Sequence, residues 1–174
     1  GVIEIINPED MSLFQDNFMP LLTILADYVA IAIHNARTYR KIESLSITDD
    51  VSGYYNTRYM HKHLDQLLVQ GQEVSLVFLD VDNFKEVVDS HGHLLGSKIL
   101  GEAAEVIASK LEENDRLVRY GGDEFVIVLP GQDKHAAFDK VVAVRKALAD
   151  AAFLQDMELA IKLTASFGIA NYPG

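Results

Sequence analysis

Apolar residues recur along the chain with two spacings, one typical of strands and one typical of helices. Short apolar runs bounded by acidic or turn-forming residues predict strands at residues 74–81, 117–120, 125–129 and 159–170. Apolar positions three and four residues apart predict helices at residues 57–70, 86–90, 96–111 and 133–151, with a loop at 91–93. Asn56 is a candidate cap for the first of these helices, and Gly71 is a candidate stop.

From residue 74 onward the predicted order is β-α-β-β-α-β, with the first helix divided in two. This is the split βαβ arrangement, an α+β fold with a mixed, largely antiparallel sheet. A right-handed crossover makes the strands at 74–81 and 117–120 parallel, and the strand at 125–129 returns between them. The turn before that strand then lies at the carboxyl end of strand 74–81. Asp80 is therefore expected near Asp123 and Glu124.

The first 46 residues have a different pattern. Residues 1–6 read as a strand, residues 7–10 as a loop, and Ser12 has the spacing of a capping box at the start of a helix. Apolar positions then follow a heptad-like seam, formed by Leu22, Leu25, Val29, Ala32, Ala36 and Tyr39. The helix either packs on its own domain or pairs with a second copy to transmit a signal, and we favour the pairing.

Composition narrows the class of protein. The chain has 174 residues, of which 49% are hydrophobic and 24% charged, as expected for a soluble globular protein. It contains no cysteine, which fits a reducing cytoplasm. A net charge of −11 argues against nucleic-acid binding. The most apolar stretch, residues 21–33, is too short to span a bilayer, so we expect no membrane segment in this chain.

Acidic residues mark the turn between the strands at 117–120 and 125–129. Gly121 and Gly122 precede Asp123 and Glu124, and a Gly-Gly pair predicts a hairpin because glycine readily adopts positive φ. Asp80 and Asp82, at the end of the earlier strand, share one face if that strand continues through them. Carboxylates converging from both places would suit a magnesium–nucleotide site.

The letters of these segments resemble a known family. Residues 121–125 read Gly-Gly-Asp-Glu-Phe and residues 80–85 read Asp-Val-Asp-Asn-Phe-Lys. They resemble the signature and the D-x-D-x-F-K segment of the GGDEF family of diguanylate cyclases. Residues 46–56 and 164–170 are similar to its D-x-L-T-G-L-x-N-R-R and T-x-S-x-G-I-A segments. The resemblance implies a palm-like nucleotidyl cyclase fold and a homodimer that condenses two GTP into cyclic di-GMP, releasing pyrophosphate, with Mg²⁺ or Mn²⁺.

The resemblance also implies roles for individual residues. Asp80 and the backbone carbonyl of Val81 would hold a metal, Asp123 would be a metal ligand and the base on the 3′-hydroxyl, and Glu124 would serve a second metal. Four residues would bind the phosphates. Gly121 and Gly122 have no side chain to block a phosphate from the backbone, and Phe84 and Lys85 would place amides and a cation beside it. A cyclase of mononucleotides, with a similar fold, is a weaker alternative because its motifs differ.

Base recognition departs from the family pattern, F-K-x-x-N-D…G-H-x-x-G-D. His93 keeps its place, but Val88 and Ser97 replace the Asn and Asp that grip guanine. Valine cannot hydrogen-bond a base, and a hydroxyl both donates and accepts, so we expect relaxed purine selectivity, with ATP accepted and some mixed cyclic GMP–AMP formed. The alternative is a catalytically weak or inactive domain that binds nucleotide and relays a signal.

Two further departures concern regulation and completeness. The family's product-inhibition site is R-x-x-D, and here Asp115 fits but Glu112 replaces the arginine, so we expect no feedback inhibition through it. The resemblance assigns residues 47–174 to the cyclase domain, without its final helix and the phosphate-binding basic residue of that helix. Residues 1–46 resemble the end of a GAF-type sensor domain with a dimerising linker helix.

Overall fold

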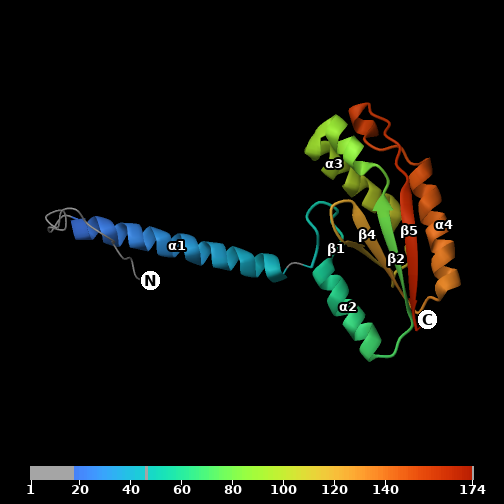
Figure 1. Ribbon diagram of the computed structural model, residues 1–174, viewed down its shortest axis with the longest axis horizontal. Coiled ribbons are helices and arrows are strands. Elements are labelled where there is room, and N and C mark those ends of the chain that lie inside the picture. Colours follow the sequence, from blue (N-terminus) through green and yellow to red (C-terminus); the bar gives the residue numbers. More distant parts are fainter. Residues whose placement is uncertain (1–17, 46, 174) are drawn as a thin grey trace. The chain divides into compact units, whose positions relative to one another are not determined.

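The computed structural model describes residues 18–45 and 47–173 and divides them into two compact units (Figure 1). The first unit, residues 1–46, contains α1 (Phe18–Leu45). The second, residues 47–174, contains the elements β1 (Tyr55–Asn56), α2 (Thr57–Val69), β2 (Val74–Val81), α3 (Phe84–Ala108), β3 (Arg116–Arg119), β4 (Glu124–Pro130), α4 (Lys134–Asp150), a 3₁₀ turn (Gln155–Met157) and β5 (Ala165–Tyr172).

The described part of the chain forms one sheet with the strand order β1-β3-β4-β2-β5. β1 is parallel to β3, and the β3–β4, β4–β2 and β2–β5 pairs are antiparallel. β2 and β3 therefore run in the same direction with β4 between them, as the crossover argument predicted. The predicted α+β fold with a mixed sheet is confirmed.

Alternate residues of the central strands face two separate cores. Val77, Leu79 and Val81 of β2 are buried on one face together with apolar residues of α3 and α4. On the other face, Met60 and Leu67 of α2 pack with Val118, Val126 and Val128. Because side chains alternate along a strand, each face has its own apolar set. The sheet that carries the end of β2 is therefore packed on both of its faces.

Helix termini follow the predicted signals. The Asn56 side chain accepts a hydrogen bond from the backbone N–H of Tyr59 at the start of α2. Gly71, just beyond the end of that helix, has a φ of +64°, a conformation that glycine adopts without strain. Asp133 caps α4 by accepting from the N–H groups of His135 and Ala136. The predicted cap at Asn56 and stop at Gly71 are confirmed, and the cap at Asp133 is an addition from the structure.

Two element boundaries were predicted wrongly. α3 begins at Phe84 and continues through the predicted loop, with Gly92 (φ 83°, ψ 162°) as the point where two helical segments meet. β5 begins at Ala165 and not at residue 159. The apolar residues before it are buried without joining the ladder: Leu163 is in the core, and Ile161 makes an isolated bridge with Phe153. Apolar periodicity reports burial, and burial does not require strand pairing.

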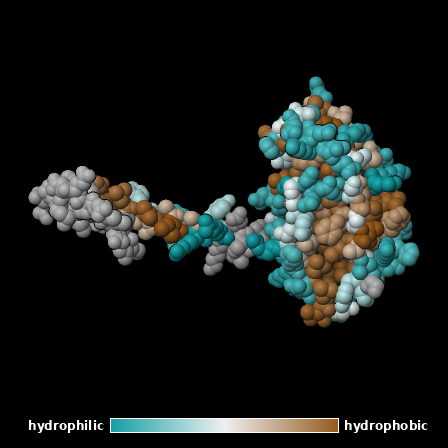
Figure 2. All heavy atoms as spheres, in the orientation of Figure 1, coloured by the Kyte–Doolittle hydropathy of each residue, from teal (hydrophilic) through white to brown (hydrophobic). Residues whose placement is uncertain are grey.

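The α1 helix exposes many apolar side chains, which Figure 2 shows along its length. They include Leu21, Leu25, Tyr28, Val29 and Tyr39, each about half exposed or more. In the described residues, no helix has both the length and the apolar character needed to cross a bilayer. The strand predicted at residues 1–6 and the helix start predicted at Ser12 lie outside the described residues.

His63 of α2 belongs to a stack of aromatic side chains. It is half-buried, its ring stacks on Tyr59 with centroids 5.4 Å apart, and Tyr59 stacks on Tyr55 at 3.7 Å. Its Nε2 atom is buried and has no hydrogen-bond partner among the described residues. Burial, followed by the charge of Arg116, lowers the pKa of His63 below 6.5.

Replacing His63 with Gln is expected to make the free energy of unfolding less dependent on pH between about 5 and 8. The folded state disfavours the protonated ring, so stability is greatest above the unfolded-state pKa and is lost as the pH falls below it. Urea unfolding at several pH values measures this dependence. His61→Gln, at an exposed position two residues away, is the control; equal pH dependence in both variants would contradict the prediction.

Candidate active site

The pairing of β2 with β4 brings the acidic residues of two motifs together. Asp80 and Glu124 are direct cross-strand partners, and both are exposed on the same face of the sheet. The backbone N–H of Val81 donates to the carbonyl of Asp123 over 3.3 Å. The predicted meeting of the hairpin turn with the end of β2 is confirmed.

The glycines of the hairpin act differently from the prediction. The turn closes where the N–H groups of Tyr120 and Gly121 donate to the carbonyl of Glu124, over 2.8 and 3.3 Å. Neither Gly121 nor Gly122 has a positive φ. A Cβ at Gly121 would lie 2.6 Å from a carboxylate oxygen of Glu124, whereas one at Gly122 would meet nothing within 4 Å. A Cβ at Gly121 would therefore push the end of the exposed Glu124 side chain aside, and Gly122 leaves its backbone open.

The Arg119 side chain binds the backbone of the hairpin turn. Its guanidinium donates to the carbonyls of Gly121 (3.2 Å) and Gly122 (3.1 and 2.7 Å) and pairs with Asp49 at 3.1 Å. Asp49 also accepts hydrogen bonds from the backbone N–H and the hydroxyl of Ser52. Burial alone would raise the pKa of Asp49, but these partners outweigh it and lower that pKa. The turn is thus tied to the segment before α2.

The charges at the end of β2 are not balanced by cations. In the described part of the chain the Asp80 carboxylate has no hydrogen-bond or salt-bridge partner, and burial followed by the charges of Asp123 and Asp82 raises its pKa. Asp82 instead has a lowered pKa, because the hydroxyls of Thr164 and Ser166 donate to it. The acids form a set of hard oxygen donors of the kind that Mg²⁺ or Mn²⁺ binds. Among the described residues, no three such side chains are already gathered to hold an ion.

The first turn of α3 lies directly after these acids. Asn83, in the left-handed region with a φ of 55°, turns the chain from β2 into the helix. Phe84 and Lys85 begin α3, Phe84 half-buried and Lys85 exposed. A helix N-terminus offers unpaired N–H groups and partial positive charge, which favours phosphate. Phe84 and Lys85 were expected in a loop and lie on a helix instead.

The two segments of α3 meet at the residues expected to contact the base. Gly96 is buried, and a Cβ there would lie 2.9 Å from Val88 Cγ2 and 3.3 Å from Phe84 Cζ. Val88 on the first segment therefore packs against the second segment, next to Ser97. Val88 and Ser97 are both half-buried, and His93, beside the bend at Gly92, is exposed.

Comparison with known proteins agrees with this geometry. Residues 46–174 match the family described as diguanylate cyclase, GGDEF domain. The chain belongs to the GGDEF family. The second unit is accordingly a GGDEF domain.

Several relatives of this GGDEF domain are named diguanylate cyclases. The chain is 32% identical over 134 residues to diguanylate cyclase VdcA of Vibrio cholerae, covering 75% of this chain and 39% of that protein. It is 28% identical over 162 residues to diguanylate cyclase A of Treponema denticola, covering 91% of this chain and 43% of that protein. The chain thus spans less than half of these relatives.

A solved structure has the same fold. Diguanylate cyclase SiaD of Pseudomonas aeruginosa, crystallised with its activator SiaC, matches with a TM-score of 0.67 and 29% identity, over 94% of this chain and 65% of that one.

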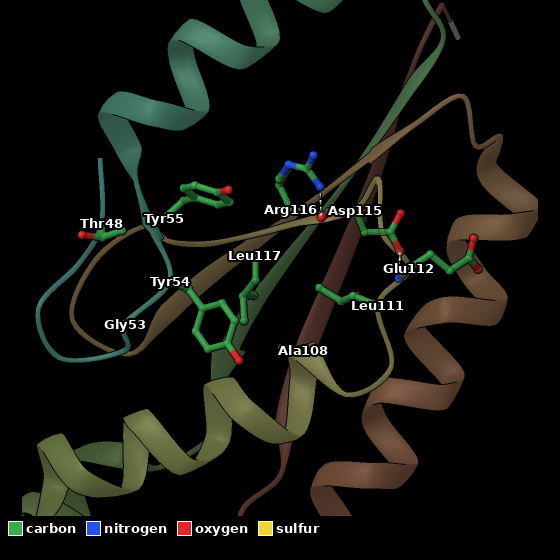
Figure 3. Close-up of a pocket in the computed structure, with 10 residues that line it drawn as sticks. All are labelled: Thr48, Gly53, Tyr54, Tyr55, Ala108, Leu111, Glu112, Asp115, Arg116 and Leu117. Atoms are coloured by element: carbon green, nitrogen blue, oxygen red, sulfur yellow. Dashed lines mark hydrogen bonds between the residues drawn. The ribbon is translucent and has the colours of Figure 1, made fainter. Parts of the chain in front are cut away.

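The residues of the expected inhibitory site lie together in this GGDEF domain (Figure 3). Glu112 and Asp115 line a cavity of about 410 Å³ with Tyr54, Tyr55 and neighbouring residues. Lys140 lies 2.8 Å from Glu112 and 3.0 Å from Asp115. The second Asp115 oxygen accepts from Gln132 over 2.8 Å. Burial would lower the pKa of Lys140, but its two acidic partners outweigh burial and raise it. The charges here are already paired within the protein.

Sequence reasoning underestimated Arg119 and Asp82. Sequence reasoning gave Arg119 no role in the site, but its side chain is 14% exposed and makes five hydrogen bonds to Gly121, Gly122 and Asp49. Asp82 is fully engaged by hydroxyls of residues 164 and 166. The family's segments gave a signal for both contacts. Asp49, the partner of Arg119, lies in the segment similar to D-x-L-T, and the hydroxyls that bind Asp82 lie in the segment similar to T-x-S.

Proposed function

We propose that this GGDEF domain condenses two molecules of GTP into cyclic di-GMP and releases pyrophosphate. The observation that supports this best is the β2–β4 register. It opposes Asp80 to Glu124 and bonds Val81 to Asp123 at the point where α3 begins. Acids for a metal and an N-terminus for phosphates are thereby adjacent, as nucleotidyl transfer requires.

Each residue in the site has a distinct task in this proposal. Asp80, the carbonyl of Val81, Asp123 and Glu124 would hold Mg²⁺ or Mn²⁺, which when bound neutralises phosphate oxygens and acidifies the attacking hydroxyl. Asp123 accepts the proton of the 3′-hydroxyl. Lys85 and the first N–H groups of α3 bind the triphosphate, and the bare backbone of Gly121 and Gly122 lets it approach.

Dimerisation completes the reaction, because each new phosphodiester bond joins the nucleotides of two subunits. The exposed apolar residues of α1 repeat at the spacing of a paired helix, which supports a homodimer through this helix. In this arrangement residues 1–46 are the end of a GAF-like sensor domain and its linker, and residues 47–174 are the cyclase domain of a cytoplasmic protein. The sensor's signal then acts by changing how the two cyclase domains face each other.

Relaxed base selectivity follows from the contact between the two segments of α3. Val88 lies against Gly96 and offers the base an apolar surface, and the Ser97 hydroxyl can both donate and accept. Neither residue enforces guanine, so ATP enters as well and some product is cyclic GMP–AMP. Incubation with magnesium and GTP, ATP or both, followed by chromatography with mass detection, tests the proposal. Cyclic di-GMP alone from the mixture would contradict the relaxed selectivity.

A nucleotide-binding relay without turnover is the second candidate. It is favoured by the replacement of the family's Asn and Asp by Val88 and Ser97, and by the dispersed acids of the described site. Absence of any cyclic product from folded, dimeric protein would establish it. Feedback inhibition at Asp115 and Glu112 is absent in either case, because a phosphate there needs a free cation and Lys140 is already paired with both acids.

The variant Val88→Asn/Ser97→Asp is expected to favour guanine by about tenfold or more over the unmodified chain. A carboxylate accepts from both N–H donors of guanine and is left unpaired against adenine. The measurement is the ratio of cyclic di-GMP to cyclic GMP–AMP from an equal mixture of GTP and ATP. Ser90→Asp adds the same charge at an exposed site of α3 and is the control. An unchanged ratio would refute the role of these positions.

A further inference from the structure

Two aspartates at the end of β2, Asp80 and Asp82, differ in their hydrogen-bond partners. The Asp80 carboxylate has no partner among the described residues. Asp82, two residues later, is committed on both oxygens: the Thr164 hydroxyl donates to Oδ2 over 2.6 Å and the Ser166 hydroxyl to Oδ1 over 2.7 Å. Its backbone N–H also donates to the carbonyl of Thr164 over 3.0 Å. One carboxylate is free for a ligand and the other is used by the fold.

These three bonds tie the end of β2 to the start of β5, beside the proposed metal ligands. Ser166 is the β5 partner of Asp80, and Ala165 is the partner of Val81. Ser166 also lines a cavity of about 250 Å³ together with Asp80 and Glu124. On the other side of Asp82 lies Asn83, whose φ of 55° is uncommon for a residue other than glycine. The Asp82 bonds hold the turn at the point where the chain must adopt this conformation.

We propose that Asp82 is a positioning residue of the cyclase site, which acts through its bonds to Thr164 and Ser166 and does not itself bind the metal. The inference rests on the proposed function. Asp82 aligns the Asp80 side chain, the Val81 carbonyl and the start of α3, so that the metal and the triphosphate meet preformed ligands. Groups that orient metal ligands in this way typically change metal affinity by about 10- to 100-fold when removed.

The opposite hypothesis, that Asp82 is a metal ligand, predicts the reverse outcome for one variant. Thr164→Val/Ser166→Ala removes both hydroxyls and leaves the Asp82 carboxylate free. A positioning residue then loses its hold on the turn, and metal binding weakens. A metal ligand would instead be released from competing bonds, and metal binding would be unchanged or tighter.

The experiment is calorimetric titration of the chain with the manganese complex of a non-hydrolysable α,β-methylene analogue of GTP, repeated with the analogue in EDTA. We expect the double variant to bind the manganese complex about tenfold more weakly or worse, with little change in EDTA. Thr164→Ser keeps the hydroxyl and should bind like the unmodified chain. Ser109→Ala, which removes an exposed hydroxyl at the end of α3, is the matched control.

Each outcome separates the two proposals. Unchanged or tighter manganese binding by the double variant would overturn the positioning role, and so would equal weakening with and without metal. The single variants Thr164→Val and Ser166→Ala give the same test if the double variant melts at a lower temperature. Asp80→Asn should abolish the metal-dependent part of binding. If it binds like the unmodified chain, the proposed cyclase site itself is wrong.

Discussion

Asp123→Asn is expected to lower turnover by about 10²- to 10⁴-fold, to the limit of detection for a slow cyclase. The asparagine amide cannot accept the proton of the 3′-hydroxyl and binds a divalent cation more weakly than a carboxylate does. The fold is expected to persist, because the bond from Val81 to residue 123 uses the backbone carbonyl, which Asn retains. Product formation by chromatography and thermal unfolding of the same sample measure the two effects.

The melting temperature of Asp123→Asn should equal or exceed that of the unmodified chain in the absence of metal. Asp123 is one of the charges that raise the pKa of Asp80, so its neutralisation removes repulsion from this end of the sheet. Asp139→Asn, at an exposed position on α4, controls for the charge change. Turnover at the unmodified rate in Asp123→Asn would exclude the proposed base.

Arg119→Ala should destabilise the domain by about 1–3 kcal/mol and reduce turnover by about 10²-fold. The substitution leaves the Gly121 and Gly122 carbonyls without their donor and Asp49 without its cation. The hairpin turn then shifts, and Asp123 and Glu124 shift with it. Urea unfolding and steady-state kinetics at saturating metal report the two losses.

A double-mutant cycle with Asp49→Ala separates the ion pair from the carbonyl contacts. Coupling between Arg119 and Asp49 should be favourable, yet Asp49→Ala alone should cost less turnover, because the guanidinium still holds the turn. Arg119→Lys keeps the charge but lacks the planar fork of donors with which Arg119 reaches Gly121, Gly122 and Asp49 together. Full activity in Arg119→Lys would show that only charge is needed, contrary to the expectation.

Much of the fold could be predicted because its determinants are local. The apolar run of β2, the hairpin between β3 and β4 and the cap at Asn56 all depend on neighbouring residues. Handedness of the crossover then sufficed to place Asp80 beside Asp123 and Glu124. Where periodicity alone was used, at residues 159–164, the prediction failed, because buried apolar side chains occur in loops as well as strands.

The site was harder to predict where contacts join distant residues. Arg119 and Asp49 are 70 positions apart, and nothing in the composition near either one indicates that they meet. The glycines were correctly placed in a hairpin, but not for the predicted reason: neither has a positive φ, and a Cβ at Gly121 would meet the Glu124 carboxylate. His63 is half-buried because it stacks on Tyr59, four residues earlier. Residues four apart meet on a helix, so this contact can be expected only once the helix itself is known.

The position of β2 between β4 and β5 affects the order in which the domain can fold. The hydroxyls that donate to Asp82 belong to Thr164 and Ser166, which lie 82 and 84 residues further along the chain. β5 is the last strand described. Pairing over such separations requires closing a long loop before any contact is gained, which slows folding. During synthesis β2 therefore emerges long before β5, with one edge unpaired and prone to association with other chains. The turn that carries Asp80 and Asp82 is completed only when the last strand is added.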